Sequence, residues 1–528
     1  MSAREDRMTR RELLQFAGAI GTGAIGLPLA TRLLPSKQFG PSRIDVEGIG
    51  WQGTAKFPDR RPITQFPKKI PPSRHKRPNV VLIVLDTVRA DHLSCYGYHR
   101  QTTPNIDAFA ARSRVYDNVL SPGGWTLPSH ASLFTGLPIS AHGTRWWHQT
   151  LEPRFETLAG KLLADGYQTA GLSSNEGFVS ARCGLDRGFE HFEAFDCFKD
   201  GLGGAAHRLQ PRLAEWFARQ YDGRRPFFLF LNYMEAHDPY LAPTEHLEWA
   251  SPETRQKWKK GVASLMEEFM YLGRDAPTRD ELLEVEGLYD SALHYLDAWV
   301  GEFLDFLETS GLAENTLVLI TSDHGEHFGE KRRLLHWLSL YEPVVRVPLI
   351  LGHAGHVPPG RVTDLVQAHD AFATILDYAG VERERDPAGN SRNLLEAPST
   401  GESRYAFSEY FNVAQGRTEW GLNYPKVDFT PWFTDIKVVQ RGSWKLIHFG
   451  YGREELYDLS KDPAELHNLA DEKPDVVKTF LAQLDNWLRS FPQYVAPPPW
   501  EGRAAADVGS GVLTPEEEKQ FRGLGYIH

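Results

Sequence analysis

The chain has 528 residues, which is too long for one simple hydrophobic core, so we expect a large domain and a smaller unit. With 41% hydrophobic and 24% charged residues it is not a disordered chain, and its formal net charge of −11 disfavours a nucleic-acid partner. Three cysteines exclude a disulfide scaffold; they are three buried thiols, or Cys183 bridged to Cys197 with Cys95 left over.

Residues 1–36 have the features of an export signal. Arg10 and Arg11 precede a Gly- and Ala-rich apolar stretch at 16–30, which is shorter than the ~20 residues of a membrane-spanning helix. The run at 9–14 resembles a twin-arginine signal, which exports folded proteins. An amphipathic helix is the alternative, but four glycines in the apolar stretch disfavour it. We predict export to the periplasm or the extracellular space, with no stable membrane span.

The next segment, 37–76, is rich in Pro, Lys and Arg and is expected to form an extended linker. Beyond it, over 77–400, short apolar runs predict strands that are buried on both faces: Asn79–Leu85, Phe227–Leu231, Leu317–Thr321 and Val347–Leu351. Helical patterns lie between them, the clearest with apolar side chains three and four residues apart from Tyr289 to Leu307. This alternation predicts an α/β domain with a largely parallel sheet.

The pattern changes after residue 400. Strand-like segments at Asp435–Gln440 and Trp444–Phe449 are followed by a helical stretch from Pro474 to Leu488. We therefore predict a small α+β subdomain over 401–495. The remainder, 496–528, begins with Pro and Gly, becomes charged and is expected to form a tail.

Polar residues directly follow three of the predicted strands. Asp86 follows the first, His237 lies just beyond the second, and Asp323 and His324 come after the third. Ligand sites in open α/β sheets lie beyond the carboxyl ends of the strands, so these side chains are expected to meet at one edge. Each residue alone would more often be a cap or turn residue. Together, two carboxylates and an imidazole predict a divalent-metal site.

Thr126 lies at the predicted start of a helix, after Gly123 and Gly124 and ahead of Pro128. Backbone N–H groups and the helix dipole favour an anion at such a position. A hydroxyl there, with a metal nearby to lower its pKa, is a reasonable nucleophile. The alternative is a simple threonine N-cap.

Several motifs resemble, in order and spacing, those of the sulfatase family in the alkaline phosphatase superfamily: "LDTVRADHLSCYGY", "TLPSHASLFTG", "MEAHDPY", "ITSDHGEHFGE" and "GSWKLIHFGYGREELYDLSKDPAELHNLA". The resemblance covers nearly everything after the linker. It implies an alkaline-phosphatase-like α/β/α sandwich with a mainly parallel central sheet, plus a small C-terminal α+β subdomain.

The resemblance also implies roles for individual residues. The metal ligands would be four residues: Asp86, Thr126, Asp323 and His324. Thr126 occupies the nucleophile position, His237 resembles the histidine that binds the anion or leaving group, and His336 lies near the position of a residue that faces the ester oxygens. The family usually binds one calcium ion, and a histidine ligand also admits manganese or zinc.

The chain departs from the family pattern at two places. Classical sulfatases have Cys or Ser in C/S-x-P-S-R, which matures to formylglycine, whereas this chain has Thr126 and His130 at the first and last positions. Threonine cannot give the aldehyde, because its β-carbon carries a methyl group. The second departure is Thr87, where many sulfatases have another aspartate ligand.

The resemblance therefore implies a metal-dependent hydrolase of sulfate esters or related phosphate or phosphonate esters, with a small-molecule or glycan substrate and Thr126 as nucleophile without formylglycine. One alternative is a phosphodiesterase, a phosphonate hydrolase or a phosphoryl transferase, since phosphodiesterases and phosphoethanolamine transferases of the same superfamily use a threonine nucleophile. Another is a non-catalytic binding protein of the same fold, although the retained Asp86, His237, Asp323 and His324 argue against it.

Overall fold

The structure is a computed structural model that describes residues 64–145, 149–197, 204–262, 277–383, 390–396, 404–411 and 434–494. The predicted signal segment, most of the predicted linker and the tail lie outside these ranges, and the predicted domain boundaries stay predictions. Among the described helices, none combines the length and the apolar character needed to cross a membrane.

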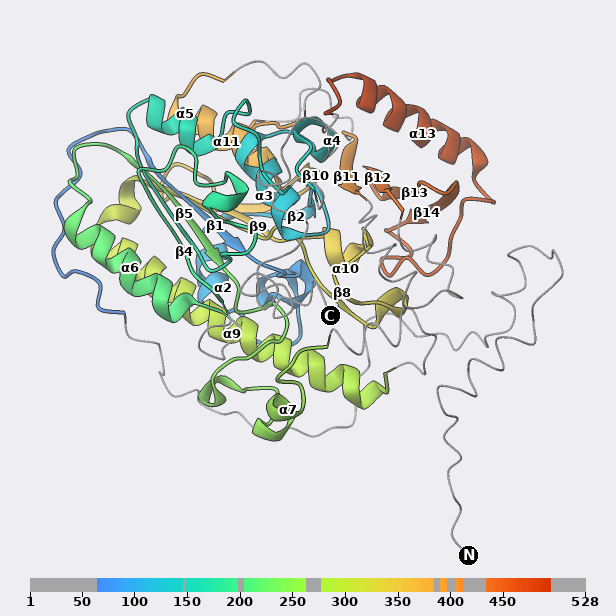
Figure 1. Cartoon of the computed structure of the whole chain (residues 1–528), viewed down its shortest axis with the longest axis horizontal. Helices are drawn as coiled ribbons and strands as arrows, with labels where there is room; N and C mark the ends of the chain where they lie inside the picture. Colours follow the sequence, from blue (N-terminus) through green and yellow to red (C-terminus); the bar gives the residue numbers. More distant parts are fainter. Residues whose placement is uncertain are drawn as a thin grey trace, which may run out of the picture. The chain divides into compact units, whose positions relative to one another are not determined.

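An eight-stranded sheet forms the centre of the larger domain (Figure 1). Its strands, in spatial order, are β10 (Gly360–Gln367), β2 (Arg114–Leu120), β9 (Leu349–Gly352), β6 (Thr316–Thr321), β1 (Asn79–Leu85), β5 (Phe227–Tyr233), β3 (Gln168–Ser173) and β4 (His191–Ala194). All neighbouring pairs are parallel except the two that involve β9. Pro348 stands just before β9, and because proline cannot donate to a ladder, this strand begins two residues later than its apolar run predicts.

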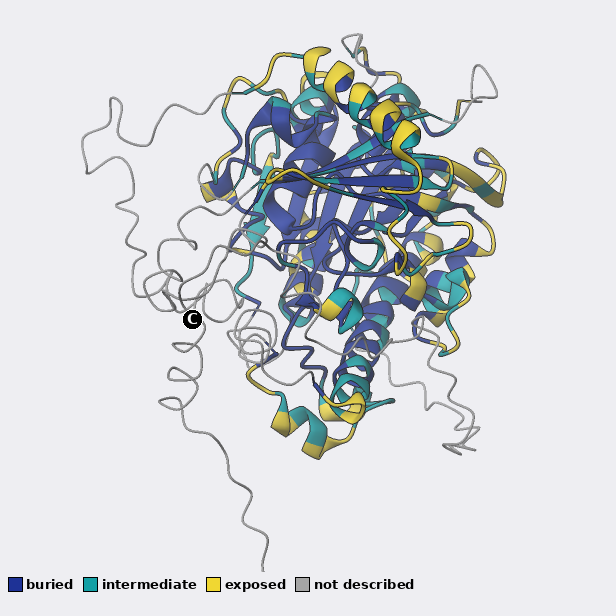
Figure 2. Cartoon of the chain, turned by 90° about the vertical axis from the view of Figure 1, so that its right-hand side faces the viewer, coloured by how far each residue is buried: buried dark blue, intermediate teal, exposed yellow. Residues whose placement is uncertain are grey.

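Helices cover both faces of the sheet. One face packs against α2 (Pro104–Ala110), α6 (Ala206–Arg219) and α9 (Arg279–Thr309), and the other against α3 (Thr126–Thr135), α5 (Leu158–Ala164) and α11 (Asp370–Ala379). Every residue of β1, β5 and β6 is buried as a result, which explains their continuous apolar sequences. Figure 2 shows the centre of the sheet in the buried colour, and most exposed residues lie on outer helices and loops.

The longest helix, α9, follows the predicted apolar face. It begins with a capping box, in which Thr278 accepts from the Glu281 amide and Glu281 accepts from the Thr278 amide. The apolar side chains that were predicted to share one face, from Tyr289 to Leu307, are buried in the main hydrophobic core.

A second, antiparallel sheet forms the C-terminal subdomain. Its strands are β11 (Ala406–Tyr410), β12 (Ile436–Arg441), β13 (Trp444–Phe449) and β14 (Arg453–Asp458). One face packs against α13 (Pro474–Arg489) around a small separate core: Val439, Leu446, Leu456, Phe480, Leu484 and Trp487. The predicted architecture, a mainly parallel α/β domain plus a small C-terminal α+β unit, is confirmed.

Shorter elements complete the described chain: α4 (Ile139–His142), α7 (Pro252–Lys257), α10 (Glu342–Val345), β7 (His327–Phe328) and β8 (Leu334–Leu335). The three cysteines are free thiols, with Cys183 and Cys197 buried and Cys95 half-buried.

Candidate active site

The candidate site lies beyond the carboxyl ends of four adjacent strands, β6, β1, β5 and β3. Asp86 follows β1, Asp323 and His324 follow β6, and His237 lies in the turn after β5. Because these strands are parallel neighbours, their C-terminal ends meet at one edge, and residues far apart in the sequence converge there.

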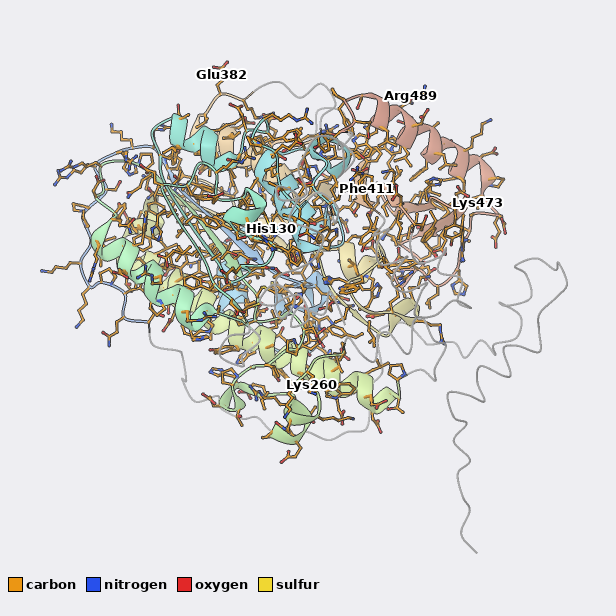
Figure 3. All side chains as sticks on the ribbon, viewed as in Figure 1. His130, Lys260, Glu382, Phe411, Lys473 and Arg489 are labelled. Carbon is orange, nitrogen blue, oxygen red and sulfur yellow. The ribbon has the colours of Figure 1, made fainter. Side chains whose placement is uncertain are left out.

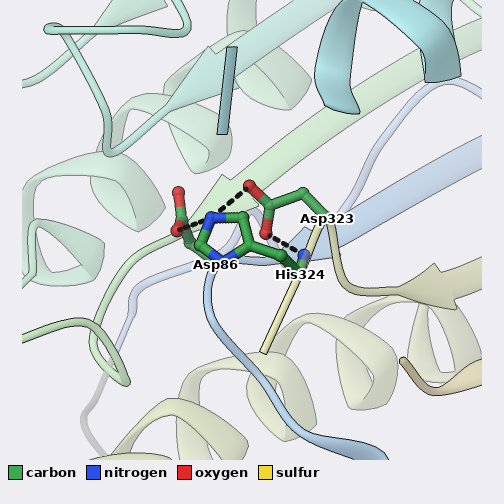
Figure 4. Close-up of side chains that lie close together, drawn as sticks. All are labelled: Asp86, Asp323 and His324. Atoms are coloured by element: carbon green, nitrogen blue, oxygen red, sulfur yellow. Dashed lines mark hydrogen bonds and ion pairs between the residues drawn. The ribbon is translucent and has the colours of Figure 1, made fainter. Parts of the chain in front are cut away.

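Asp86, Asp323 and His324 form a fully buried trio (Figure 4). One ligand atom from each lies within 4.8 Å of the others. The Nε2 atom of His324 is 3.5 Å from Asp323 Oδ2 and 3.9 Å from Asp86 Oδ1. Neither of these two carboxylate oxygens accepts a hydrogen bond from any described residue. Buried carboxylate oxygens without donors are costly, which points to a cation as their partner.

The electrostatics of the trio agree with that reading. Burial, together with the nearby charge of Asp323, raises the pKa of Asp86 to about 8. Burial also raises the pKa of Asp323 to about 7, against the hydrogen bonds that its carboxylate accepts. Two like charges that share a buried site disfavour each other's ionisation, and a divalent cation reverses this preference.

A hydrogen bond to the backbone orients the imidazole of His324. Its Nδ1 lies 3.0 Å from the carbonyl oxygen of Gly325, so Nδ1 carries the proton and donates it. Nε2 is then left with its lone pair directed toward the two carboxylates and toward Thr126. This is the tautomer that a metal ligand requires.

Thr126 is the first residue of α3 and is not its N-cap. The N-cap position belongs to Trp125, and the hydroxyl Oγ1 of Thr126 lies 3.3 Å from His324 Nε2. The amide groups of a helix's first turn lack intrahelical acceptors, so this end of α3 favours an anion next to the hydroxyl. Thr126 therefore lies between the trio and the N-terminus of α3.

His336 packs against His324, and His237 packs against His336. The rings of His324 and His336 stack with their centroids 4.3 Å apart, and the His237 ring meets His336 edge-on at 5.6 Å. Nδ1 of His237 donates to the carbonyl of Asp238, so its Nε2, which has no partner among the described residues, carries a lone pair. Burial lowers the pKa of His237 to about 4 and that of His336 well below its usual value. All six residues predicted from the sequence thus lie in one buried region.

Comparisons with known proteins identify the family to which the chain belongs. The model described as sulfatase matches residues 78–381, more than half of the chain, and the model described as N-sulphoglucosamine sulphohydrolase, C-terminal, matches residues 325–491. The chain belongs to the sulfatase family. It is an ester hydrolase of that family, whose members generally bind a divalent metal, and the trio is the candidate metal site.

Curated relatives are similar at low identity over most of the chain. The uncharacterized sulfatase YidJ of Escherichia coli is 25% identical over 437 residues, covering 75% of this chain and 84% of that protein. An arylsulfatase of Clostridium perfringens is 24% identical over 460 residues, covering 75% and 91%.

Solved structures share the fold. BT4656, determined in complex with its substrate D-glucosamine-2-N,6-O-disulfate, has a TM-score of 0.63 at 19% identity, covering 79% of this chain and 98% of that one. The phosphonate monoester hydrolase of Agrobacterium radiobacter has a TM-score of 0.59 at 22% identity, covering 78% and 95%.

In this sulfatase, His130 lies behind the trio. Its Nδ1 is 2.9 Å from the carbonyl oxygen of Thr126, to which it donates, and 3.4 Å from Asp323 Oδ2. Burial lowers its pKa to about 3, so the ring is neutral. Figure 3 shows His130 in the interior of the larger domain, while Arg489 of α13 lies at the surface. His130 thus bonds the first turn of α3 and lies close to Asp323 without adding a charge.

Two contacts of the trio were not predicted from the sequence. Asn175, two residues beyond β3, donates from its side-chain amide to Asp86 Oδ2 at 3.1 Å. Thr87 has a left-handed backbone with φ of 58°, and its hydroxyl lies 2.7 Å from the carbonyl of Asp86 and 2.9 Å from that of Ala236. Thr87 thus contacts the backbone, so its side chain does not replace the missing aspartate. Asn175 follows a strand as Asp86 does, and this placement is the signal that identifies it.

Proposed function

We propose that this sulfatase hydrolyses sulfate or phosphonate-type esters, with Thr126 as nucleophile and one divalent cation held by Asp86, Asp323 and His324. The observation that carries the proposal is the 3.3 Å contact between Thr126 Oγ1 and His324 Nε2, beside two carboxylate oxygens without donors. A threonine that served only as a cap would turn its hydroxyl to the backbone of its own helix. The hydroxyl of Thr126 is instead at the candidate metal site.

The residues that would hold the ion fit a hard or borderline divalent cation. Two carboxylates and a hydroxyl suit calcium or manganese, and the imidazole extends the range to zinc. When bound, such a cation supplies positive charge that lowers the pKa of an adjacent hydroxyl and neutralises charge on ester oxygens. His324 is held in the required tautomer by Gly325, and Asn175 orients Asp86.

In the proposed reaction, Thr126 Oγ forms a bond to sulfur or phosphorus while the bond from that atom to the leaving oxygen breaks. The hydroxyl proton leaves Thr126, and the departing alcohol gains one. Water then cleaves the threonyl ester, which restores the hydroxyl and releases the anion. The N-terminus of α3 stabilises negative charge on the non-bridging oxygens. His237 and His336 are assigned to contact the ester oxygens and the leaving group.

Phosphodiester hydrolysis is the second candidate, beside the sulfate and phosphonate hydrolysis proposed above. Two structural neighbours, from Agrobacterium radiobacter and Silicibacter pomeroyi, carry the name phosphonate monoester hydrolase, with TM-scores of 0.59 and 0.58. The substrate in the BT4656 complex is a sulfated sugar, which supports a glycan or small-molecule ester in the same way. A threonine nucleophile without formylglycine is compatible with either class.

The test combines metal analysis with turnover of nitrophenyl sulfate, phosphate, phosphodiester and phosphonate. We expect stoichiometric divalent metal and one clearly preferred ester. Thr126→Ala should lose at least ~10³-fold in turnover while keeping the fold. Thr126→Ser should retain partial activity, and mass spectrometry of the parent should show unmodified threonine.

Three outcomes contradict the proposal. Equal turnover by Thr126→Ala and the parent would remove Thr126 from the chemistry. An altered mass at Thr126 would contradict catalysis by an unmodified threonine. A metal-loaded parent that turns over none of the four esters would favour the alternative of a non-catalytic binding protein.

We also propose export through the twin-arginine route, on the strength of Arg10 and Arg11 ahead of the Gly-rich apolar segment. Replacing both arginines by lysine should leave the protein in the cytoplasm on fractionation. The matched control replaces Arg4 and Arg7, which lie outside the pair, and should not alter export. Unchanged export of the Arg10/Arg11 variant would exclude this route.

A further inference from the structure

The short helix α10 (Glu342–Val345) is a common support for three loops of the candidate site. Its backbone carbonyls, with that of the residue after it, accept hydrogen bonds from four amides: Gly325 to Val344 at 2.7 Å, Glu326 to Pro343 at 3.0 Å, Ser121 to Val345 at 2.8 Å and Ala90 to Arg346 at 3.4 Å. These amides belong to the loops that follow β6, β2 and β1. The position of α10 therefore determines where the backbone next to His324 lies.

A buried ammonium group from the C-terminal sheet holds the start of α10. Lys445 of β13 places Nζ 2.8 Å from Glu342 Oε1 and 2.8 Å from Glu465 Oε1. Glu465 also accepts the backbone amide of Glu342 through Oε2 at 2.8 Å. The first residue of α10 is thus held through both its side chain and its amide.

Stability alone does not account for this arrangement. The side chains of Lys445 and Glu465 are completely buried, and that of Glu342 is 15% exposed. Desolvating three charges is unfavourable, and well-packed apolar residues often replace buried ion pairs without loss. Burial works against the ammonium, but the two carboxylates outweigh it and raise the pKa of Lys445. Unlike apolar packing, a charged cluster fixes the direction in which its hydrogen-bonded groups point.

We propose that Lys445 is a positioning residue for the active site: through Glu342 it fixes α10, and through α10 it fixes the loop that carries Asp323 and His324. This inference deepens the proposed function and rests on it. Lys445 touches neither the trio nor Thr126 in this scheme. The C-terminal sheet would therefore contribute to catalysis without supplying a reacting group.

A second contact from the same sheet points the same way. The amide of Glu409 in β11 donates to the carbonyl of Pro122 at 2.9 Å, and the Glu409 carboxylate accepts the amide of Ser140 at 2.8 Å. Pro122 lies in the loop that leads to Thr126. The small sheet thus contacts both sides of the site, the nucleophile side through β11 and the metal side through β13.

The test compares Lys445→Met with the parent, using the full chain. Hydrogen–deuterium exchange of peptides covering residues 323–328 should be at least about tenfold faster in the variant, because the Gly325 and Glu326 amides lose their fixed acceptors. The kcat for the preferred ester should fall about 10- to 100-fold, as expected when reacting groups are displaced, with little change in KM. Lys445→Arg should restore both readouts.

The matched control is Arg404→Met, which removes another nearly buried cation. Arg404 pairs with Asp370 at 2.6 Å, and Asp370 accepts the amides of Gln367 and Arg392 next to α11. This variant should lose stability but keep parental exchange at 323–328 and parental kcat. If Lys445→Met fails to fold, Glu342→Gln removes one charge at constant shape, and the same two readouts apply with a smaller change expected.

Two results would overturn the inference. Parental exchange at 323–328 in Lys445→Met would show that α10 does not depend on the cluster, and an unchanged kcat would show that the loop's position does not matter. If the parent hydrolyses none of the test esters, the proposed function fails on its own, while the exchange measurement still decides whether Lys445 holds the loop.

Discussion

Among the described residues of the larger domain, two clusters of ionisable side chains around buried carboxylates differ in how those carboxylates are satisfied. In the closed cluster, Asp290 accepts from His92 Nδ1 at 2.8 Å through one oxygen and from Tyr98 and Arg100 at 2.8 and 2.6 Å through the other. In the open cluster, the trio of Asp86, Asp323 and His324, each carboxylate keeps one oxygen without a donor among the described residues.

The pKa values follow this difference. Burial opposes ionisation in both clusters, but His92 and Arg100 outweigh it and lower the pKa of Asp290. In the open cluster burial and the neighbouring carboxylate raise the pKa of Asp86 to about 8. Two equally buried carboxylates therefore differ in pKa according to the charges that surround them. The closed cluster supplies its own cations, and the open cluster is complementary to one from outside.

The largest expected effect on stability comes from opening the closed cluster. Asp290→Ala leaves the buried His92 and the half-buried Arg100 without their common carboxylate, so the free energy of unfolding should fall by about 3–5 kcal/mol. Urea unfolding measures this, and metal content should stay at the parental level. A loss below about 1 kcal/mol would show that the closed cluster is not held together by its charges.

The corresponding change in the open cluster should act on metal binding. Asp323→Ala removes a candidate ligand, and affinity for the bound divalent metal should fall at least ~100-fold, or about 2.7 kcal/mol. The metal-free variant should be at least as stable as the metal-free parent, because a buried carboxylate oxygen without a donor, Oδ2, is gone. Elemental analysis and titration calorimetry are the measurements. Stoichiometric metal in Asp323→Ala would exclude the trio as the site.

The pH dependence of the metal-free protein tests the raised pKa of the open cluster. The pKa of Asp86 is about 8 in the folded chain and about 3.9 when unfolded, so its contribution to stability is full below pH ~4 and is lost as pH rises through 8. Between pH 6 and 8 the parent should lose on the order of 2 kcal/mol more than Asp86→Asn. Urea unfolding in a chelator at both pH values measures this difference. Parallel pH profiles would contradict the raised pKa.

The smallest expected effect concerns Asn175, which is not a member of the open cluster but donates a hydrogen bond to it. Asn175→Ala removes the donor to Asp86 Oδ2 and should weaken metal binding about tenfold, or ~1.4 kcal/mol. Asn118→Ala is a suitable control, because that side chain bonds a carbonyl in an exposed part of the sheet edge. Equal metal affinity in both variants would show that Asp86 needs no orientation from Asn175.

Much of the fold was predictable because the central strands are buried on both faces. The apolar run Asn79–Leu85 coincides with β1, and the apolar face of α9 lies where its spacing predicts. The polar residues after β1 and β6 were found for the same reason, since the end of an apolar run in the sequence marks the end of a buried strand. Strands of mixed polarity, such as β10 with its exposed residues, give no comparable signal.

The family, the two-part architecture, the candidate ligands and the threonine that excludes formylglycine could be predicted from the sequence, because they depend on residue identity and short-range pattern. Three contacts were found only in the folded chain: Thr126 faces His324, Asn175 donates to Asp86, and Lys445 reaches α10. Each of these contacts joins segments between about 90 and 200 residues apart, as with |i−j| of 198 for Thr126 and His324. Local periodicity carries no information about such pairs, because sheet order and loop packing bring them together.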